Sequence, residues 1–246
     1  WEVGQEITGK IGNPSFTEAD IAPWPFVHSG GNTTETGGLC ELYSGSEADL
    51  YQYIELPAGM YTLECQGYYR IGQSWDVDPN TYGTDDWVDE AFLTVQNGKY
   101  NVDSNEFTPG RTFKTPLMPR LFDYQDSKIY DMNEAGDESS WDMTDGDYGS
   151  KGWGPTSVPG SLKWFAAGKY QPYDEDGVKY NTVTIFLTED GYVKIGVTKA
   201  AARNADSFMA TNFKLYYAGE AGEAVELLAL QEEVDDLWAQ LERLRD

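Results

Sequence analysis

The stretch LYQYIELPAGMYTLECQGYYR (50–70) carries the clearest strand signals of the chain. Its first part, LYQYIEL (50–56), leads into the turn Pro57-Ala58-Gly59. Its second part, MYTLECQGYY (60–69), alternates between two sets of residues: Tyr61, Leu63, Cys65, Gly67 and Tyr69 on one side, and Thr62, Glu64, Gln66 and Tyr68 on the other. A period of two residues predicts a β-strand with one buried and one mostly wet face.

Further strands follow on both sides of this stretch. AFLTV (91–95) and KYNV (99–102) flank Asn97-Gly98, a dipeptide typical of a type I′ hairpin turn. NTVTIFLT (181–188) and YVKIGVT (192–198) flank Glu189-Asp190-Gly191, which predicts a second hairpin. The last predicted strand is FMATNFKLYY (208–217), and its predicted core face consists of Met209, Thr211, Phe213, Leu215 and Tyr217. The pattern predicts a mainly β fold.

Composition agrees with this prediction and limits the partners. Among 246 residues there are 26 Gly and 11 Pro, and 14% are aromatic, which favours β-structure with many turns. The net charge of −25 argues against nucleic acid and against an anionic membrane surface, because both would be repelled. It suits neutral ligands, cationic partners or divalent cations, although solubility alone would also explain it. No stretch approaches the length of a transmembrane span, so no membrane insertion is expected.

Two long, polar, Gly-rich and aromatic excursions interrupt the strands, at 71–90 and 103–160. The second is followed by SLKWFAAGKY (161–170), which predicts one short helix. An aromatic ring can stack on the C–H face of a sugar while carboxylates take its hydroxyls. The excursions therefore supply our predicted carbohydrate-binding residues: Trp75, Asp76, Asp78, Tyr82, Trp87, Trp141 and Trp153. Alternatively, the rings only anchor long loops, and that reading stays open.

The acidic loop DVDPNTYGTDDW (76–87) is not an EF-hand. Position six of such a loop is Gly and position twelve is Glu, whereas this chain has Thr81 and Trp87 there. A solvated acidic loop or an irregular calcium site are the readings left open.

Catalytic motifs are scarce. The sole histidine, His28, has no Cys or Ser motif near it, and the chain lacks GxSxG, HExxH, P-loop and dinucleotide signatures. A carboxylate pair for glycoside hydrolysis remains open, because only the separation of two acids in space would reveal it. We therefore expect no enzyme activity and no catalytic residues.

The stretch NPSFTEADIAPWPF (13–26) combines a turn with two aromatic residues. Asn13-Pro14 favours a turn, Phe16 is predicted to fill a core, and Trp24 between two prolines is predicted to pack at an edge. The only two cysteines, Cys40 and Cys65, fall in strand-like runs outside any CxxC motif. They form either a disulfide or two inert core thiols.

The C-terminal segment differs from the rest of the chain. Apolar residues recur at spacings of 3, 4, 3, 4 and 3, which is a heptad pattern for a coiled-coil-like helix. The residues of this predicted oligomerisation seam are Leu227, Leu230, Val234, Leu237, Leu241 and Leu244. The helix would join a homo-oligomer or a partner helix, or it would pack back onto the sheet.

The order of several motifs resembles galactose-binding-domain-like β-sandwich modules, a class common among carbohydrate-binding modules. The matching pieces are NPSF (13–16), the stretch 50–70, DGYVKIGV (190–197) and NFKLYY (212–217). VPGSLKWFAAGKY (158–170) followed by NTVTIFL (181–187) resembles a variant found in secreted bacterial glycan-utilisation proteins. The resemblance implies a jelly-roll β-sandwich over residues 1–218, with the heptad helix at 220–246 as a separate unit.

The resemblance also implies roles for particular residues. NPSF would begin the first strand, with Phe16 in the core. Members of the class often hold a structural calcium through an acid after this Phe and an Asp before the Asn-Phe of the last strand. This chain has Thr17 and Thr211 at those positions, which puts the calcium in doubt, and we expect no cofactor.

Together these observations predict a non-catalytic glycan-binding module of a secreted or cell-surface bacterial protein. The alternatives are a structural or protein-interaction spacer module and, from a different class, a glycoside hydrolase.

Overall fold

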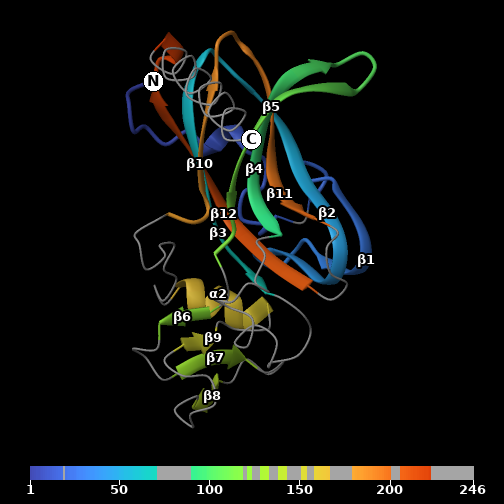
Figure 1. Cartoon of the computed structure of the whole chain (residues 1–246), viewed down its shortest axis with the longest axis vertical. Coiled ribbons are helices and arrows are strands. Elements are labelled where there is room, and N and C mark those ends of the chain that lie inside the picture. The colour runs from blue at the N-terminus through green and yellow to red at the C-terminus, as the bar shows by residue number, and fades with distance from the viewer. Residues whose placement is uncertain are drawn as a thin grey trace, which may run out of the picture.

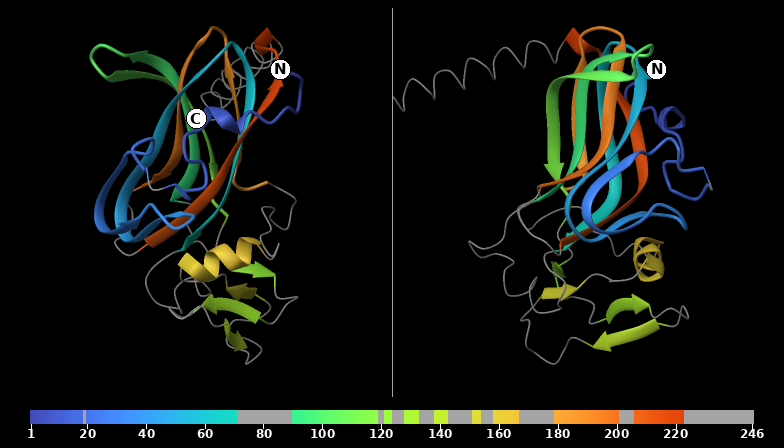
Figure 2. Two further views of the ribbon diagram at one scale, coloured as in Figure 1. Left: turned by 180° about the vertical axis from the view of Figure 1, so that it is seen from behind. Right: turned by 90° about the vertical axis from the view of Figure 1, so that its right-hand side faces the viewer.

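The computed structural model describes residues 1–18, 20–70, 90–118, 121–123, 128–132, 138–142, 151–153, 158–166, 179–200 and 206–222. The fold is mainly β, as predicted (Figure 1). A large sheet forms the main body, and the helix α2 (Val158–Ala166) lies with four short strands at one end of it in all views (Figures 1 and 2). The predicted short helix is thereby confirmed, and it begins three residues earlier than the stretch that predicted it.

The main sheet has eight strands, and seven of them follow the order β10-β3-β12-β2-β11-β4-β5, with β1 paired to β2. Their bounds are β1 Phe26–Thr34, β2 Cys40–Leu56, β3 Gly59–Arg70, β4 Ala91–Asn101, β5 Glu106–Pro116, β10 Thr182–Leu187, β11 Gly191–Lys199 and β12 Asp206–Gly219. The short strands are β6 Leu121–Asp123, β7 Lys128–Met132, β8 Glu138–Asp142 and β9 Lys151–Trp153. One 3-10 helix, η1 (Thr8–Lys10), precedes them all. The excursion at 103–160 is thus not a loop throughout, because it contains β5 to β9 and the start of α2.

The 17-residue strand β2 joins the two halves of this sheet. Its residues 40–45 pair with β12, whereas its residues 48–56 pair with β11. At the far ends of the strand order, β10 packs against β4 and β5. Phe186 of β10 and Phe113 of β5 meet there edge to face, with ring centroids 5.4 Å apart. The sheet therefore curls until it is nearly closed around its own interior.

The interior is one large apolar cluster to which every long strand except β1 and β5 contributes fully buried residues. On β3 the predicted alternation holds, since Tyr61, Leu63, Cys65 and Tyr69 are buried in this cluster. Tyr68 is an exception on the opposite face, where it is only 2% exposed. It lies in a second, smaller cluster with Leu39, Met118, Phe165 and Met209, which connects α2 to the sheet.

Both predicted hairpins are wrong in their detail. β10 and β11 do not pair with each other, because β10 pairs with β3 and β11 with β2 and β4. The turn at Glu189-Asp190 therefore crosses between the two halves of the sheet. Asn97 and Gly98 lie inside β4, at a register shift against β5, and the chain turns only after Asn101. A β-bulge occupies the place of the predicted type I′ turn.

The predicted core face of the last strand is wrong for its first half, because a second bulge exchanges the two faces of the strand. The register of β12 against β3 shifts between Thr211 and Lys214, and Asn212 has a left-handed φ of 49°. After the bulge Phe213 and Leu215 face the large cluster as predicted, but before it Phe208 and Ala210 do so. A shift of one residue exchanges the two faces of a strand, which is why a uniform alternation fails here.

The aromatic residues of the N-terminal stretch are packed in the core. Trp24 is only 2% exposed and packs on Phe16 and Phe213, with ring centroids 5.3 and 4.8 Å away. Its indole N–H donates to the carbonyl of Gly12 at 2.7 Å. The predicted packing roles of Trp24 and Phe16 are thus confirmed. NPSF does not begin a strand, however, because Asn13 and Phe16 have left-handed φ values and the segment forms a turn.

Cys40 and Cys65 are both buried and no disulfide joins them, so the disulfide alternative is wrong. Burial raises the pKa of Cys65 and of Cys40 well above the usual value, and nearby glutamates raise both further. The thiolate is the reactive form of cysteine, so both side chains act as small core residues.

Within the described parts of the chain, no helix has the length and apolar character that crossing a membrane would require.

Candidate functional site

Most residues of the predicted site lie outside the described part of the chain. This holds for Trp75, Asp76, Asp78, Tyr82 and Trp87 of the first excursion, and for all six residues of the predicted heptad seam. Trp141 lies on β8, in register with Ile129 of β7. Trp153 lies on β9, in register with Leu121 of β6. These two tryptophans are therefore strand residues rather than loop residues.

A different site is visible on the solvent-facing side of β2, β11, β4 and β5. A hollow of about 320 Å³ lies on this face, and we call it the groove. It is lined by Asp49, Leu50, Tyr51, Thr94, Gln96, Thr112, Lys114, Lys194, Ile195, Gly196 and Thr198. Successive side chains of a strand point to opposite faces, so the outward residues alternate with core residues such as Leu50 and Ile195.

Strand register arranges the outward residues in three rows that cross the four strands. The middle row is Tyr51, Gly196, Thr94 and Lys114. One flanking row is Tyr53, Lys194, Gln96 and Thr112, and the other is Asp49, Thr198, Phe92 and Pro116. Neighbouring strands lie about 4.8 Å apart, so the middle row is about 14 Å long. Its two central members have no side chain or a short one, and its ends carry a ring and an ammonium group.

Gly196 forms the floor of the groove. A Cβ at this position would lie 1.8 Å from the carbonyl oxygen of Leu50, so the backbone of β2 leaves no room for a side chain. The φ of Gly196 is 156°, in the region that favours glycine. Close packing of the two backbones therefore keeps the middle of the face hollow.

Asp49, Lys194 and Tyr51 form one polar and aromatic unit at the β2 end. The ammonium group of Lys194 donates to Oδ2 of Asp49 at 2.5 Å and lies 4.5 Å from the centroid of the Tyr51 ring. The other carboxylate oxygen, Oδ1, is buried and has no hydrogen-bond partner among the described residues. The Asp49 side chain as a whole is 35% exposed, so its carboxylate stays within reach of a hydroxyl supplied by a ligand, although Oδ1 itself is covered.

An aromatic strip continues from the groove toward the turn between β4 and β5. Tyr53 stacks on Tyr100 with centroids 4.9 Å apart and planes at 24°, and Phe107 and Tyr192 pack beside them. Burial raises the pKa of Tyr53, and the neighbouring Tyr51, Asp49 and Tyr100 raise it further. A second hollow of about 600 Å³ lies at the end of this strip and includes Tyr100 and Tyr192.

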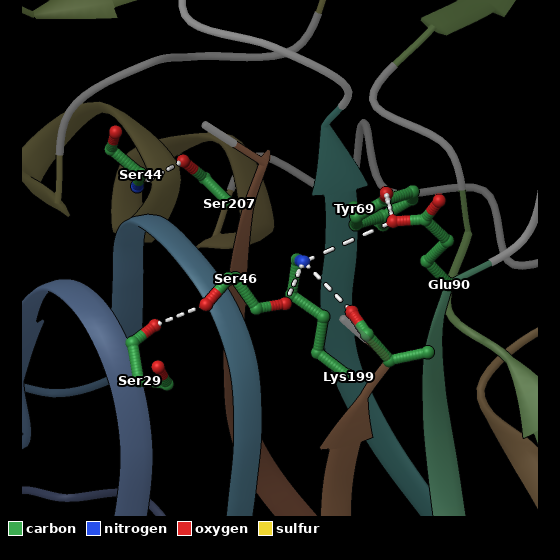
Figure 3. A network of polar contacts seen from close by, with 8 residues as sticks. Ser29, Ser44, Ser46, Tyr69, Glu90, Lys199 and Ser207 are labelled. Atoms are coloured by element: carbon green, nitrogen blue, oxygen red, sulfur yellow. Dashed lines mark hydrogen bonds and ion pairs between the residues drawn. The ribbon is translucent and has the colours of Figure 1, made fainter. Parts of the chain in front are cut away.

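A buried polar network surrounds Lys199 at the end of β11 (Figure 3). Lys199 follows the groove residue Thr198, and its ammonium group donates to the carbonyls of Ser46 and Ala200 at 2.5 and 3.0 Å. It also lies 3.9 Å from Oε2 of Glu90, which accepts a hydrogen bond from the Tyr69 hydroxyl at 3.1 Å. Tyr69 and Glu90 stand close to the two ends of the undescribed stretch 71–89.

The residues at the implied calcium position do not fit a cation. The hydroxyl of Thr211 donates to the carbonyl of Gly38 at 2.6 Å and contacts that of Ser15 at 3.4 Å. The side-chain amide of Asn13 donates to the carbonyls of Glu18 and Asp20 at 3.3 and 3.1 Å. Calcium needs carbonyl and carboxylate oxygens that point at it, whereas here donors already occupy the carbonyls. The described residues also contain no group of three or more His, Cys, Asp or Glu side chains placed to hold a metal.

The groove contains little that could catalyse a reaction. Asp49 is its only carboxylate among the described residues, whereas glycoside hydrolysis uses two facing acids. His28 lies on β1, away from the groove, with its Nδ1 2.9 Å from the carbonyl oxygen of Gly30.

Comparisons with known proteins give fold neighbours only. No protein-family model matches the chain, and no curated protein matches it. Four chains of solved structures match. One is TmCBM61 in complex with β-1,4-galactotriose, at 13% identity and a TM-score of 0.35, with 85% of this chain and 97% of that chain covered. Another is the carbohydrate recognition domain of Emp47p, at 12% identity and a TM-score of 0.34, with coverage of 87% and 97%. TM-scores this low carry no argument about the fold or the site of this chain.

The groove was not predicted from the sequence, because its residues lie within strands rather than on the aromatic loops. A signal was nevertheless present in β2. Asp49, Tyr51 and Tyr53 occupy its alternate, solvent-facing positions, whereas the positions between them are largely apolar. What the sequence could not provide was the register that brings Lys194, Gly196 and Lys114 beside them.

Proposed function

We propose that this protein is a non-catalytic module that binds glycan, and that the groove is the surface that receives the sugar. The observation that carries the proposal is the unit formed by Asp49, Lys194 and Tyr51. It offers a partly exposed ring, a partly exposed carboxylate and an ammonium group within one small area.

Each of these groups matches a part of a sugar. The C–H face of a pyranose packs on an aromatic ring, and Tyr51 and the adjacent strip supply rings. A hydroxyl donates to the carboxylate of Asp49, and further hydroxyls meet Gln96, Thr94 and Thr112. The floor at Gly196 leaves room for a ring to lie flat across the strands. Sites of this kind bury a ligand mostly through apolar contact and orient it with a few polar groups.

The proposal also includes features that are predicted from the sequence and that the structure does not test. Trp75, Tyr82 and Trp87 would add rings from the stretch whose ends meet the Lys199 network, and Trp141 and Trp153 would add rings from β8 and β9. The heptad helix would cluster several sites, so that weak single contacts add up to useful avidity. The nearly closed sheet would be a jelly-roll β-sandwich, and the protein would act outside the cell, secreted or on the bacterial surface.

A glycan-array screen followed by titration calorimetry tests the proposal. The full chain is compared with Tyr51→Ala and Asp49→Asn, and Tyr43→Ala serves as the control because Tyr43 is exposed on the same strand outside the groove. We expect each groove variant to lower the affinity for the selected glycan at least tenfold, the order expected when one ring or one charged hydrogen bond is lost, about 1.5 kcal/mol or more. The control should bind as the parent does.

Two results would overturn the proposal. The first is selective binding that neither groove variant weakens, which would move the site elsewhere, for example to Trp87. The second is the absence of any glycan binding by protein shown to be folded. That outcome would favour the alternative of a structural or protein-interaction spacer.

A further inference from the structure

Charge is distributed very unevenly over the main sheet. The protein has a net charge of −25, and β2 carries four acids, Glu41, Glu47, Asp49 and Glu55, and no base. The three neighbouring strands β11, β4 and β5 have the opposite character. Together they carry a single acid, Glu106, against Lys99, Arg111, Lys114, Lys194 and Lys199.

The one acid on these strands is far from the groove. Glu106 begins β5 at the turn after β4, where it accepts a hydrogen bond from Ser104. Of the bases, Lys199 is fully buried beside Glu90, whereas Lys114 and Lys194 line the groove together with one carboxylate, that of Asp49. The groove is therefore locally cationic on a strongly acidic protein.

Lys114 is the unbalanced charge. Lys194 is paired with Asp49, but Lys114 forms no ion pair with any described residue. Its ammonium group lies 4.1 Å from the centroid of the Phe92 ring, which holds it at the β5 end of the middle row. Tyr51 and Asp49 stand at the other end, about 14 Å away across three strand spacings. A ligand that reaches across the groove thus meets an acceptor and a ring at one end and a free cation at the other.

We infer that the glycan received by the groove is anionic, and that its carboxylate or sulfate group binds Lys114 while another of its sugar rings packs on Tyr51. This inference rests on the proposed function and adds the charge class of the ligand. The overall charge of the protein does not prevent it. Charges more than about 8 Å apart are largely screened at physiological salt, so a bound anion responds chiefly to the lysines it touches.

The test compares three polymers against the full chain: a neutral β-1,4-galactan, polygalacturonate as a carboxylate polymer, and a sulfated galactan. Each is titrated at low salt and again at roughly 0.3 M salt. The variants are Lys114→Gln in the groove and Lys214→Gln as the matched control, since Lys214 is also exposed on a strand but lies by a different hollow. Asp49→Asn is included to report on the groove itself.

We expect one or both anionic polymers to bind more tightly than neutral galactan, with an affinity that falls as salt rises. Lys114→Gln should lower that affinity about three- to tenfold, while Lys214→Gln leaves it unchanged. The polymer that responds distinguishes carboxylate from sulfate as the recognised group.

The failures are distinguishable. Neutral galactan binding as tightly as the anionic polymers, with loss in Asp49→Asn but not in Lys114→Gln, would overturn this inference and leave the proposed function intact. Anionic binding that neither Lys114→Gln nor Asp49→Asn weakens would overturn both, because the ligand would then sit outside the groove.

Discussion

Gly196 decides at the residue scale whether the groove exists. Its neighbours along β11, Ile195 and Val197, are buried core residues, so the strand cannot move outward to make room for a side chain. The close approach to Leu50 then requires glycine for a steric reason that no alternation pattern reveals. A single residue without a side chain thus keeps open the space between Tyr51 and Lys114.

We predict that Gly196→Ala destabilises the fold by about 2–4 kcal/mol, because the new Cβ would overlap the Leu50 carbonyl and force β2 and β11 apart. Urea unfolding followed by circular dichroism measures this change. Gly9→Ala is the matched control, since a Cβ at Gly9 meets nothing within 4 Å and should change stability by less than about 0.5 kcal/mol. Equal stability of the two variants would mean that the two backbones are further apart than described.

At the scale of elements, Asn181 holds three parts of the chain together. It lies just before β10, is 1% exposed and has a left-handed φ of 53°. Its amide group donates to the carbonyl of Gly67 in β3 at 2.8 Å and accepts from the backbone N–H of Met118 at 2.9 Å. This one side chain therefore supplies hydrogen-bond partners for two backbone groups, the carbonyl of Gly67 and the N–H of Met118.

We predict that Asn181→Ala costs about 3 kcal/mol of stability, because it leaves a buried carbonyl and a buried N–H without partners and places alanine at a left-handed φ. Thermal unfolding should show a melting temperature several degrees below that of the parent. Asn32→Ala on the exposed strand β1 is the control and should melt with the parent. A small effect at Asn181 would indicate that solvent reaches these groups after the substitution.

At the level of the whole molecule, two connecting turns, which we call the arches, link the two halves of the sheet. β2 continues into β3 through Pro57-Ala58, and β10 continues into β11 through 188–190, and both connections cross from one half to the other. Oδ1 of Asp190 accepts a hydrogen bond from the N–H of Ala58 at 2.9 Å, which ties the arches together. Near the N-terminal turn, the side chains of Asn13 and Thr211 likewise donate hydrogen bonds to backbone carbonyls.

We therefore predict that a structural calcium is not required. Adding calcium or a chelator should leave the melting temperature unchanged within about 1 °C, whereas an ion held at a hundred times its Kd would add about 2.7 kcal/mol and shift melting by several degrees. Differential scanning calorimetry of the whole chain measures this directly. A clear rise with calcium would contradict the prediction and place a metal among the acids of 71–89 or at Asn13.

Much of the fold was predictable from local patterns, and the errors have definite causes. The mainly β class, the burial of Phe16 and Trp24, and the alternation of β3 follow from period and residue type. The hairpins failed because a turn signal states that the chain reverses, not which strand it will pair with. The face of β12 failed because one bulge exchanges inside and outside.

What the sequence determined by itself is the class of the structure, since alternation, turn residues and aromatic content depend only on near neighbours. The groove was decided by the tertiary structure alone. Tyr51, Thr94, Lys114 and Gly196 share one row only because four strands from distant parts of the chain pair in one register. Register depends on the packing of both faces and on every bulge along the way, and these are properties of the assembled sheet rather than of any local stretch.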